Sequence, residues 1–214
     1  MKSMLSFYWH MVLCIKLEFI LGVIKMIVWK RMVNEGYNNA FLINENGKQI
    51  FERPADFMDY QINPHIRNIR IEVGKNGFPD VINYWGVNGT FIVNEKAKSV
   101  LEKNFSNQKI QFFHCQCSQY PEMNFWILNA YNYQDLLDVK QSKYDTLINL
   151  KGEEVIRSVD KYVFTKEVYE HDIFKLFISG HKRETHLFLS DRFKQVMQEN
   201  GVTGLAYKKI YESI

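Results

Sequence analysis

Two stretches of the chain share one pattern, "GTFIVNEKAKSVLEKN" at residues 89–104 and "THLFLSDRFKQVMQEN" at residues 185–200. In each stretch a short apolar run is followed by Asn94 or Ser190, residue types that favour the N-cap of a helix. An acidic residue comes next, where the helix dipole favours negative charge. Gly201, directly after the second stretch, predicts the end of that helix. The pattern therefore predicts a strand that leads into a capped helix, twice.

Both predicted helices carry apolar residues at helical spacing, so the same three positions of each should face a core. We expect these six side chains to be buried: Ala97, Val100, Leu101, Phe193, Val196 and Met197. A second strand is predicted after each helix, which gives a strand–helix–strand unit over residues 89–117 and again over 185–211. Packing and capping explain every matched position, so neither copy requires a catalytic interpretation. Two amphipathic helices also resemble each other by chance, and the sequence leaves duplication and chance open.

The rest of the chain is dominated by short predicted strands. A hairpin is expected over residues 38–51, because Asn46-Gly47 is a strong turn signal. A helical turn is expected at 133–138 and a polar loop at 181–186. Further strands are expected at residues 26–33, 68–73, 124–132, 161–168 and 172–178. The predicted fold class is α+β with mostly antiparallel sheets, and the absence of a low-complexity linker predicts a single domain over residues 26–214.

Composition restricts the function further. A chain of 214 residues with 46% hydrophobic and 15% aromatic residues has enough apolar material for a packed core. The formal net charge is only +3, and no run of Lys and Arg is longer than two. Proteins that bind nucleic acid usually carry a strongly basic stripe, so no nucleic-acid partner is expected.

The first 25 residues look like a secretion signal, but His10, Lys16 and Glu18 interrupt the apolar run and no small-residue cleavage site follows. The run is also too short to span a bilayer, so no membrane partner is expected. Codons for Gly22-Val23 can contain a ribosome-binding sequence, which makes Met26 a plausible start and residues 1–25 a translated leader. An amphipathic segment that lies on a membrane surface is the alternative.

The three cysteines, Cys14, Cys115 and Cys117, are too few and too irregularly spaced for a disulfide framework. They are typical of a protein in the reducing cytoplasm. Cys115 and Cys117 should share one face of a strand, whereas His114 points to the other face. We therefore expect no metal site and no cofactor.

No motif for phosphate binding, nucleophilic catalysis or zinc hydrolysis occurs in the chain. Pro79-Asp80 with Asp138-Val139-Lys140 allows a comparison with restriction-type nucleases, in which acids and a lysine position a metal ion. A helix and two strands separate these elements, so a metal-dependent nuclease or hydrolase is the less favoured interpretation. The absence of a catalytic set favours a binding protein.

The order of several segments resembles the bacterial immunity-protein family eleven of polymorphic toxin systems. The resemblance covers residues 26–212 and is most specific in "ILNAYNYQDLLD" and "LSDRFKQVMQENGVTGLAY". It implies a cytoplasmic antidote that binds the C-terminal domain of a cognate secreted toxin and blocks it without catalysis. The family carries no catalytic motif to transfer. The near-neutral charge departs from the acidic antidotes typical against nucleases, so the activity of the toxin stays open.

Partner contacts are expected on loops rather than on the repeated unit. Interfaces favour aromatic anchors surrounded by polar residues, and this directs attention to residues 83–89 and 118–126. The candidate partner-binding residues are Tyr84, Trp85, Tyr120 and Glu122. Core positions are the alternative for Trp85 and the favoured interpretation for Trp126, which lies inside a predicted strand. An adaptor protein unrelated to toxins is a third function that the sequence leaves open.

Overall fold

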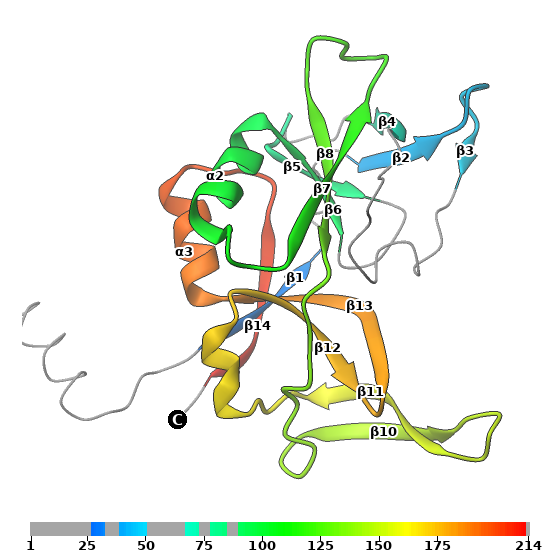
Figure 1. Ribbon diagram of the computed structural model, residues 1–214, viewed down its shortest axis with the longest axis vertical. Coiled ribbons are helices and arrows are strands. Elements are labelled where there is room, and N and C mark those ends of the chain that lie inside the picture. The colour runs from blue at the N-terminus through cyan, green and yellow to red at the C-terminus, as the bar shows by residue number, and fades with distance from the viewer. Residues whose placement is uncertain (1–26, 33–38, 51–66, 73–77, 85–89, 213–214) are drawn as a thin grey trace, which may run out of the picture.

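The computed structural model describes residues 27–32, 39–50, 67–72, 78–84 and 90–212, and every structural statement below concerns these residues. They form a seven-stranded sheet, a five-stranded sheet and a separate two-stranded hairpin (Figure 1). The seven-stranded sheet has the order β3-β2-β4-β7-β8-β6-β5, and the five-stranded sheet has the order β14-β1-β13-β12-β9. Most pairings are antiparallel, with parallel pairs at β2–β5, β4–β7 and β9–β12. The predicted α+β class with mostly antiparallel sheets is confirmed.

The elements have the following bounds: β1 Ile27–Met32, β2 Asn39–Ile43, β3 Gln49–Ile50, β4 Arg67–Glu72, β5 Val81–Tyr84, β6 Phe91–Asn94, α2 Glu95–Phe105, β7 Ile110–Gln116, β8 Phe125–Ala130, β9 Tyr133–Gln134, β10 Lys143–Ile148, β11 Glu154–Lys161, the 3-10 helix η2 Lys166–Glu170, β12 Ile173–Ile178, β13 His181–Ser190, α3 Asp191–Glu199 and β14 Ala206–Glu212.

The strand–helix–strand unit occurs twice with one topology. In the first copy β6 leads through α2 to β7, and β8 lies between the two strands, antiparallel to both. In the second copy β13 leads through α3 to β14, and β1 lies between them, again antiparallel to both. An antiparallel strand flanks the entry strand on its other side, β5 in one copy and β12 in the other. In the second copy β1 therefore occupies the position that β8 occupies in the first.

The caps of the two helices also match. Asn94 accepts a hydrogen bond from the backbone N–H of Ala97 through its side-chain oxygen at 3.0 Å, and the Ser190 hydroxyl accepts one from the N–H of Phe193 at 3.0 Å. At the other end, the side chains of Asn104 and Asn200 each donate to the carbonyl four residues earlier, both at 2.8 Å. Gly201 follows α3 with a φ of +61°, as the sequence predicts.

An aspartate at the start of each flanking strand ties the cap to the opposite helix. Asp80 accepts hydrogen bonds from the Asn94 amide at 2.9 Å and from the Lys96 ammonium at 3.0 Å. The same ammonium donates to the carbonyl of Gly201, just past the end of α3, at 2.6 Å. Lys96 therefore joins the start of α2 to the end of α3.

The second copy makes the reciprocal contacts. Asp172 accepts hydrogen bonds from the Ser190 hydroxyl and from the Arg192 guanidinium. That guanidinium also donates to the carbonyl of Asn104, in the last turn of α2, at 3.0 Å. We call these two sets of contacts the helix clasp: Asp80, Asn94, Lys96 and Gly201 on one side, and Asp172, Ser190, Arg192 and Asn104 on the other.

The segments that follow the two helices also make reciprocal contacts. Thr203, after α3, accepts a hydrogen bond from the N–H of Asp80 through its hydroxyl and one from the N–H of Val81 through its carbonyl, at 3.1 and 3.0 Å. Gln108, after α2, accepts from the N–H groups of Asp172 and Ile173 at 3.3 and 3.4 Å. Each helix–strand connection is therefore bound to the flanking strand of the other copy.

One apolar cluster lies between the two copies and joins them. It contains Phe105 of α2 and Phe193 of α3, whose ring centroids are 5.2 Å apart, together with side chains of both sheets. Of the six positions expected in the core, Ala97, Leu101, Phe193 and Met197 are fully buried, and Val100 and Val196 are half-buried against the same cluster. The expected burial is therefore confirmed at four positions and is wrong at Val100 and Val196, which occupy the same position in the two copies.

Three secondary-structure predictions are wrong. Residues 133–138 form the short strand β9 and an extended segment rather than a helical turn, because β12 pairs with Tyr133 and Gln134. In 161–168 the strand ends at Lys161, and a 3-10 helix begins at Lys166. Residues 181–186 belong to β13, where a tight turn at Ser179 and Gly180 pairs them with β12 instead of leaving a polar loop. In the first and third cases pairing with β12 overrides the local signal.

Gly204 lies where the chain returns from α3 past β5, and its φ is +91°. A Cβ atom at this position would lie 2.1 Å from the carbonyl oxygen of Val81 and 2.7 Å from the Pro79 side chain. Gly180 offers a matched control, because its φ is +74° and no atom lies within 4 Å of a Cβ placed there. We expect Gly180→Ala to cost about 1–2 kcal/mol from the left-handed backbone alone. Gly204→Ala should cost at least about 2 kcal/mol more, because the backbone of β5 must shift.

Urea denaturation of the two variants measures this difference in the free energy of unfolding. Equal losses in Gly180→Ala and Gly204→Ala would show that the Gly204 segment does not need its close approach to β5.

The carboxylate of Asp80 provides a pH test of the clasp. Partial burial acts to raise its pKa, but hydrogen bonds from the Thr203 backbone, Asn94, Lys96 and the Thr203 hydroxyl outweigh burial and lower the pKa below the ordinary aspartate value. A lowered folded-state pKa means that the stabilisation is complete above the unfolded pKa and is lost as the pH falls through the folded pKa. Asp80→Asn should therefore destabilise the protein at pH 7 by about 1–3 kcal/mol. The difference in the free energy of unfolding between Asp80→Asn and the parent protein should shrink as the pH falls below about 4.

Thermal or urea unfolding at pH 7 and at pH 3 measures that difference in the free energy of unfolding. Asp160→Asn, on the exposed hairpin, is the matched control and should change the free energy of unfolding by less than about 0.5 kcal/mol. If the loss in Asp80→Asn is the same at pH 7 and at pH 3, the charge of the Asp80 carboxylate does not stabilise the helix clasp.

Candidate partner-binding surface

The first predicted loop does not present its tyrosine to solvent. Tyr84 is the last residue of β5 and is only 7% exposed, packed in the apolar cluster of the seven-stranded sheet. The expectation that Tyr84 is exposed is wrong, because β5 pairs with both β6 and β2 and is enclosed by them. Trp85 lies outside the described residues.

The second predicted loop is the β7–β8 connection at the upper end of the molecule in Figure 1. Two backbone hydrogen bonds fold it, from Tyr120 to Cys117 at 3.0 Å and from Met123 to Tyr120 at 3.1 Å. The Tyr120 ring is half-buried, with its centroid 5.1 Å from that of Phe78, and Glu122 is exposed. Phe78 is itself 37% exposed. This end therefore combines two partly exposed aromatic rings with one acidic side chain.

Trp126 lies in β8, as predicted, but is half-buried rather than enclosed. The Lys98 ammonium of α2 lies 5.1 Å from the centre of its ring, a cation–π contact. Cys115 and Cys117 are buried free thiols on the inner side of β7 and its following loop. Beside them a polar pocket of about 380 Å³ opens, lined in part by Asn68, His114 and Asn124.

The nuclease comparison is not supported by the placement of its residues. Asp80 is bound within the helix clasp. Asp138 closes its own turn by accepting hydrogen bonds from the backbone N–H groups of Lys140 and Gln141 at 3.0 and 3.2 Å. Within the described parts of the chain, no three His, Cys, Asp or Glu side chains are arranged to hold a metal ion.

Ser190, Asp172 and His171 invite comparison with a nucleophilic triad. However, Ser190 donates to Asp172 while its oxygen caps α3, and Asn94 makes the equivalent contacts with Asp80 without any nucleophilic group. His171 instead lies with Nδ1 3.5 Å from the Asn132 amide. Burial lowers the His171 pKa, which the neighbouring Glu170 carboxylate partly opposes. Helix capping therefore explains the contacts of Ser190 and Asp172 without a catalytic role.

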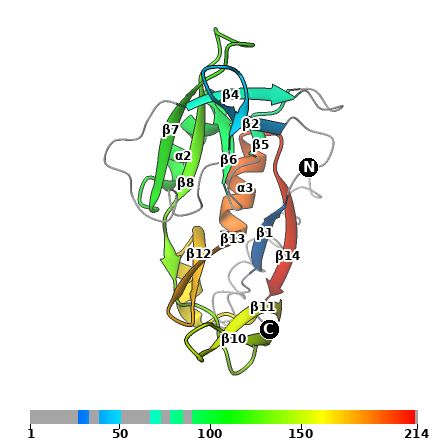
Figure 2. The same cartoon turned by 90° about the vertical axis from the view of Figure 1, so that its right-hand side faces the viewer.

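The hairpin of β10 and β11 projects from the lower end of the molecule, opposite the β7–β8 connection (Figures 1 and 2). Its base packs, through Tyr144, Ile156 and Val159, on an apolar cluster that contains Phe164, Phe174 and Phe188. Its outer half carries Leu147, Ile148 and Leu150, which are 41%, 66% and 109% exposed. The outer half therefore presents aliphatic side chains to solvent.

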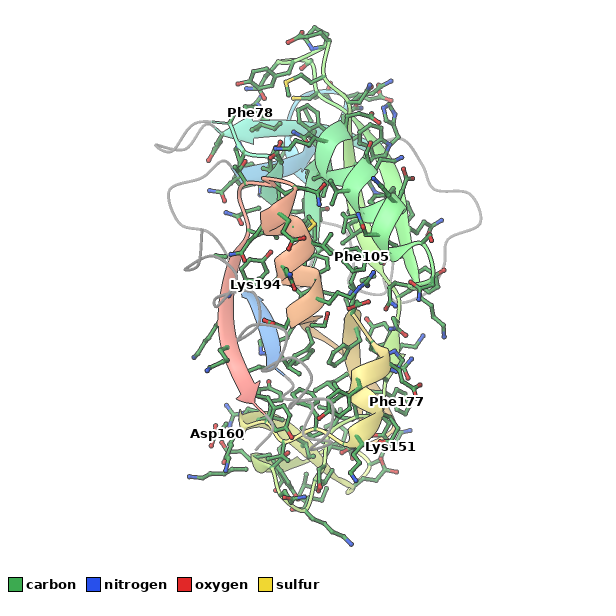
Figure 3. The ribbon with its side chains drawn as sticks, turned by 90° about the vertical axis from the view of Figure 1, so that its left-hand side faces the viewer. Phe78, Phe105, Lys151, Asp160, Phe177 and Lys194 are labelled. Carbon is green, nitrogen blue, oxygen red and sulfur yellow. The ribbon has the colours of Figure 1, made fainter. Side chains whose placement is uncertain are left out.

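Exposed apolar side chains are concentrated at this end. Among the described residues, the exposed large hydrophobics are Phe78, Val139, Leu147, Ile148, Leu150 and Tyr169. Three lie on the hairpin, Val139 shortly precedes β10, and Tyr169 belongs to η2 in the lower half of Figure 1. Figure 3 places Phe78 near the upper end and Lys151 near the lower end. This hairpin is not among the strands expected from the sequence, although Asn149 and Gly152 between two β-branched runs are a hairpin signal.

No helix among the described residues has the length and apolar character needed to cross a bilayer.

Comparison with known proteins identifies one family. The chain matches the immunity protein family Imm11 over residues 18–212, which is nearly its whole length. The match begins at residue 18, before the Met26 boundary expected from the sequence, and residues 1–26 lie outside the described structure. A search of curated proteins finds no match. Because the family match extends over far more than half of the chain, this protein belongs to the Imm11 immunity protein family.

Proposed function

We propose that this protein is an immunity protein that binds the C-terminal domain of a cognate secreted toxin and neutralises it without catalysis. Membership of the Imm11 family is the observation that carries the proposal. The structural features agree with a binding protein, since the polar groups that resemble catalytic sets are used in helix caps and turns. Exposed aliphatic side chains on a projecting hairpin are also typical of a protein-binding surface.

The proposed site of action is the cytoplasm. Cys115 and Cys117 are free thiols, which suits a reducing compartment. The antidote would meet the toxin there and hold it in an inactive complex, with no cofactor required.

We further propose a secondary contact region at the β7–β8 end, through Tyr120 and Glu122. Tyr120 already packs against Phe78 and the core, so only part of its ring is available to a partner. Glu122 is exposed and places a charge beside the ring. This arrangement is typical of the rim of an interface rather than of its centre.

We expect the toxin to be the C-terminal domain of a large secreted protein encoded by a neighbouring gene. Neutralisation is tested by expressing that domain with and without this chain. We expect survival only with the antidote, and a stable complex of the two purified proteins by size-exclusion chromatography. Survival without a complex, together with chemically altered toxin or substrate, would contradict neutralisation by binding and indicate enzymatic detoxification.

The secondary contacts are tested by calorimetric titration of the toxin domain into Tyr120→Ala and Glu122→Ala. Each should weaken binding by less than about tenfold, or about 1.4 kcal/mol, because the rim of an interface contributes little. Ser118→Ala, exposed in the same loop, is the control and should leave the affinity unchanged. A loss of more than a hundredfold in Tyr120→Ala, with the thermal unfolding of that variant unaltered, would make this end the main anchor.

A further inference from the structure

We propose that the tip of the β10–β11 hairpin, residues 147–151, is the main anchor of the toxin complex and enters a concave apolar pocket of the toxin domain. This inference rests on the proposed function and specifies the surface that performs it.

The tip contributes little to the stability of the protein itself. The base of the hairpin is seated on the core by Tyr144, Ile156 and Val159. The hairpin is two strands wide along its whole length, and Leu147 pairs with Val155 beyond the Thr146–Ile156 pair. Leu150 is 109% exposed, which means that its side chain is as accessible as in an isolated peptide. A large aliphatic side chain held in water is explained by a partner that removes it from water.

The tip is held in one shape before any partner binds. The Asn149 side chain accepts hydrogen bonds from the N–H groups of Lys151 and Glu153 at 2.9 and 3.0 Å and donates to the Glu153 carboxylate at 2.9 Å. Backbone bonds close the same turn, from Asn149 to Glu153 at 2.9 Å and from Gly152 to Asn149 at 3.0 Å. Gly152 supplies the positive φ, +79°, that the turn requires. A preformed turn lowers the entropic cost of binding.

The shape and charge of the tip define the partner. A narrow convex tip buries its aliphatic side chains only in a concave surface, and apolar clefts are typical of the functional sites of enzymes. The carboxylates of Glu153 and Glu154 are engaged within the hairpin, by Asn149 and by the Thr146 hydroxyl at 2.7 Å. Lys151, next to Leu150, is exposed and supplies a positive charge. We therefore expect an apolar pocket with a carboxylate on its rim.

An anionic membrane is the other surface that aliphatic and basic side chains bind. It is disfavoured because the hairpin carries no net positive charge that would attract anionic lipid. Its acids Asp145, Glu153, Glu154 and Asp160 balance its bases Lys143, Lys151, Arg157 and Lys161.

The experiment measures the affinity of purified variants for the toxin domain by calorimetry. Leu150→Asp should weaken binding by at least about 30-fold, the loss expected for an anchor of the interface. Leu150→Met, which keeps an apolar side chain, should stay within about threefold of the parent protein. Lys151→Glu should weaken binding by about tenfold, whereas Lys161→Glu, the same charge reversal at the base of the hairpin, should stay within about threefold. The three positions changed in these four variants are exposed, and unaltered thermal unfolding checks that the variants are folded.

Each other outcome overturns the inference in a distinguishable way. If the parent protein itself does not bind or neutralise the toxin domain, the proposed function fails. If the parent protein binds and Leu150→Asp binds equally well, the function stands and the hairpin is not the anchor. If the parent protein sediments with vesicles of phosphatidylserine and phosphatidylcholine and Leu150→Asp does not, the tip binds membranes. If light scattering shows a dimer that Leu150→Asp abolishes, the tip binds a second copy.

Discussion

The helix clasp is the constraint on which the rest of the structure depends. Lys96 and Arg192 each bind an aspartate at the start of a flanking strand and a carbonyl at the end of the opposite helix. A cation near the carbonyl end of a helix is favoured by the helix dipole, and here each cation is also paired with a carboxylate. The two helices are thereby fixed side by side, and the shared cluster around Phe105 and Phe193 fills the space between the two sheets.

The reciprocal contacts also explain the polar residues of the repeated unit without a catalytic role. The polar side chains of the helix clasp are bound to each other, to caps and to backbone groups, and most apolar side chains of the unit are buried. A rigid core of this kind leaves function to the segments inserted around it, as in many proteins whose binding residues lie on loops carried by a stable scaffold. The hairpin of β10 and β11 is such an insertion, because it pairs with neither large sheet. The β7–β8 connection, with Tyr120 and Glu122, is another.

Of the candidate partner-binding residues, Tyr120 and Glu122 were placed in a loop by sequence reasoning and lie in one. The expected loop position of Tyr84 is wrong. An aromatic residue near glycines was interpreted as a loop anchor, whereas Tyr84 is part of β5, which pairs on both edges. The hairpin was overlooked because Leu147, Ile148 and Leu150 look like core residues in sequence. Only the folded chain shows that no second layer of the described residues covers them.

The sequence by itself determined the two capped helices, their buried faces, the turn at Asn46-Gly47 and the α+β class, because capping, periodicity and turn chemistry depend on residues close together in the chain. It also carried the family resemblance. Only the tertiary structure decided that Asp80 binds Lys96 and Thr203, that β1 takes the place in one copy that β8 takes in the other, and that residues 133–138 are extended. These features depend on pairing between segments as far apart in the chain as Ile27 and Glu212, and local sequence does not encode which distant strand supplies the partner.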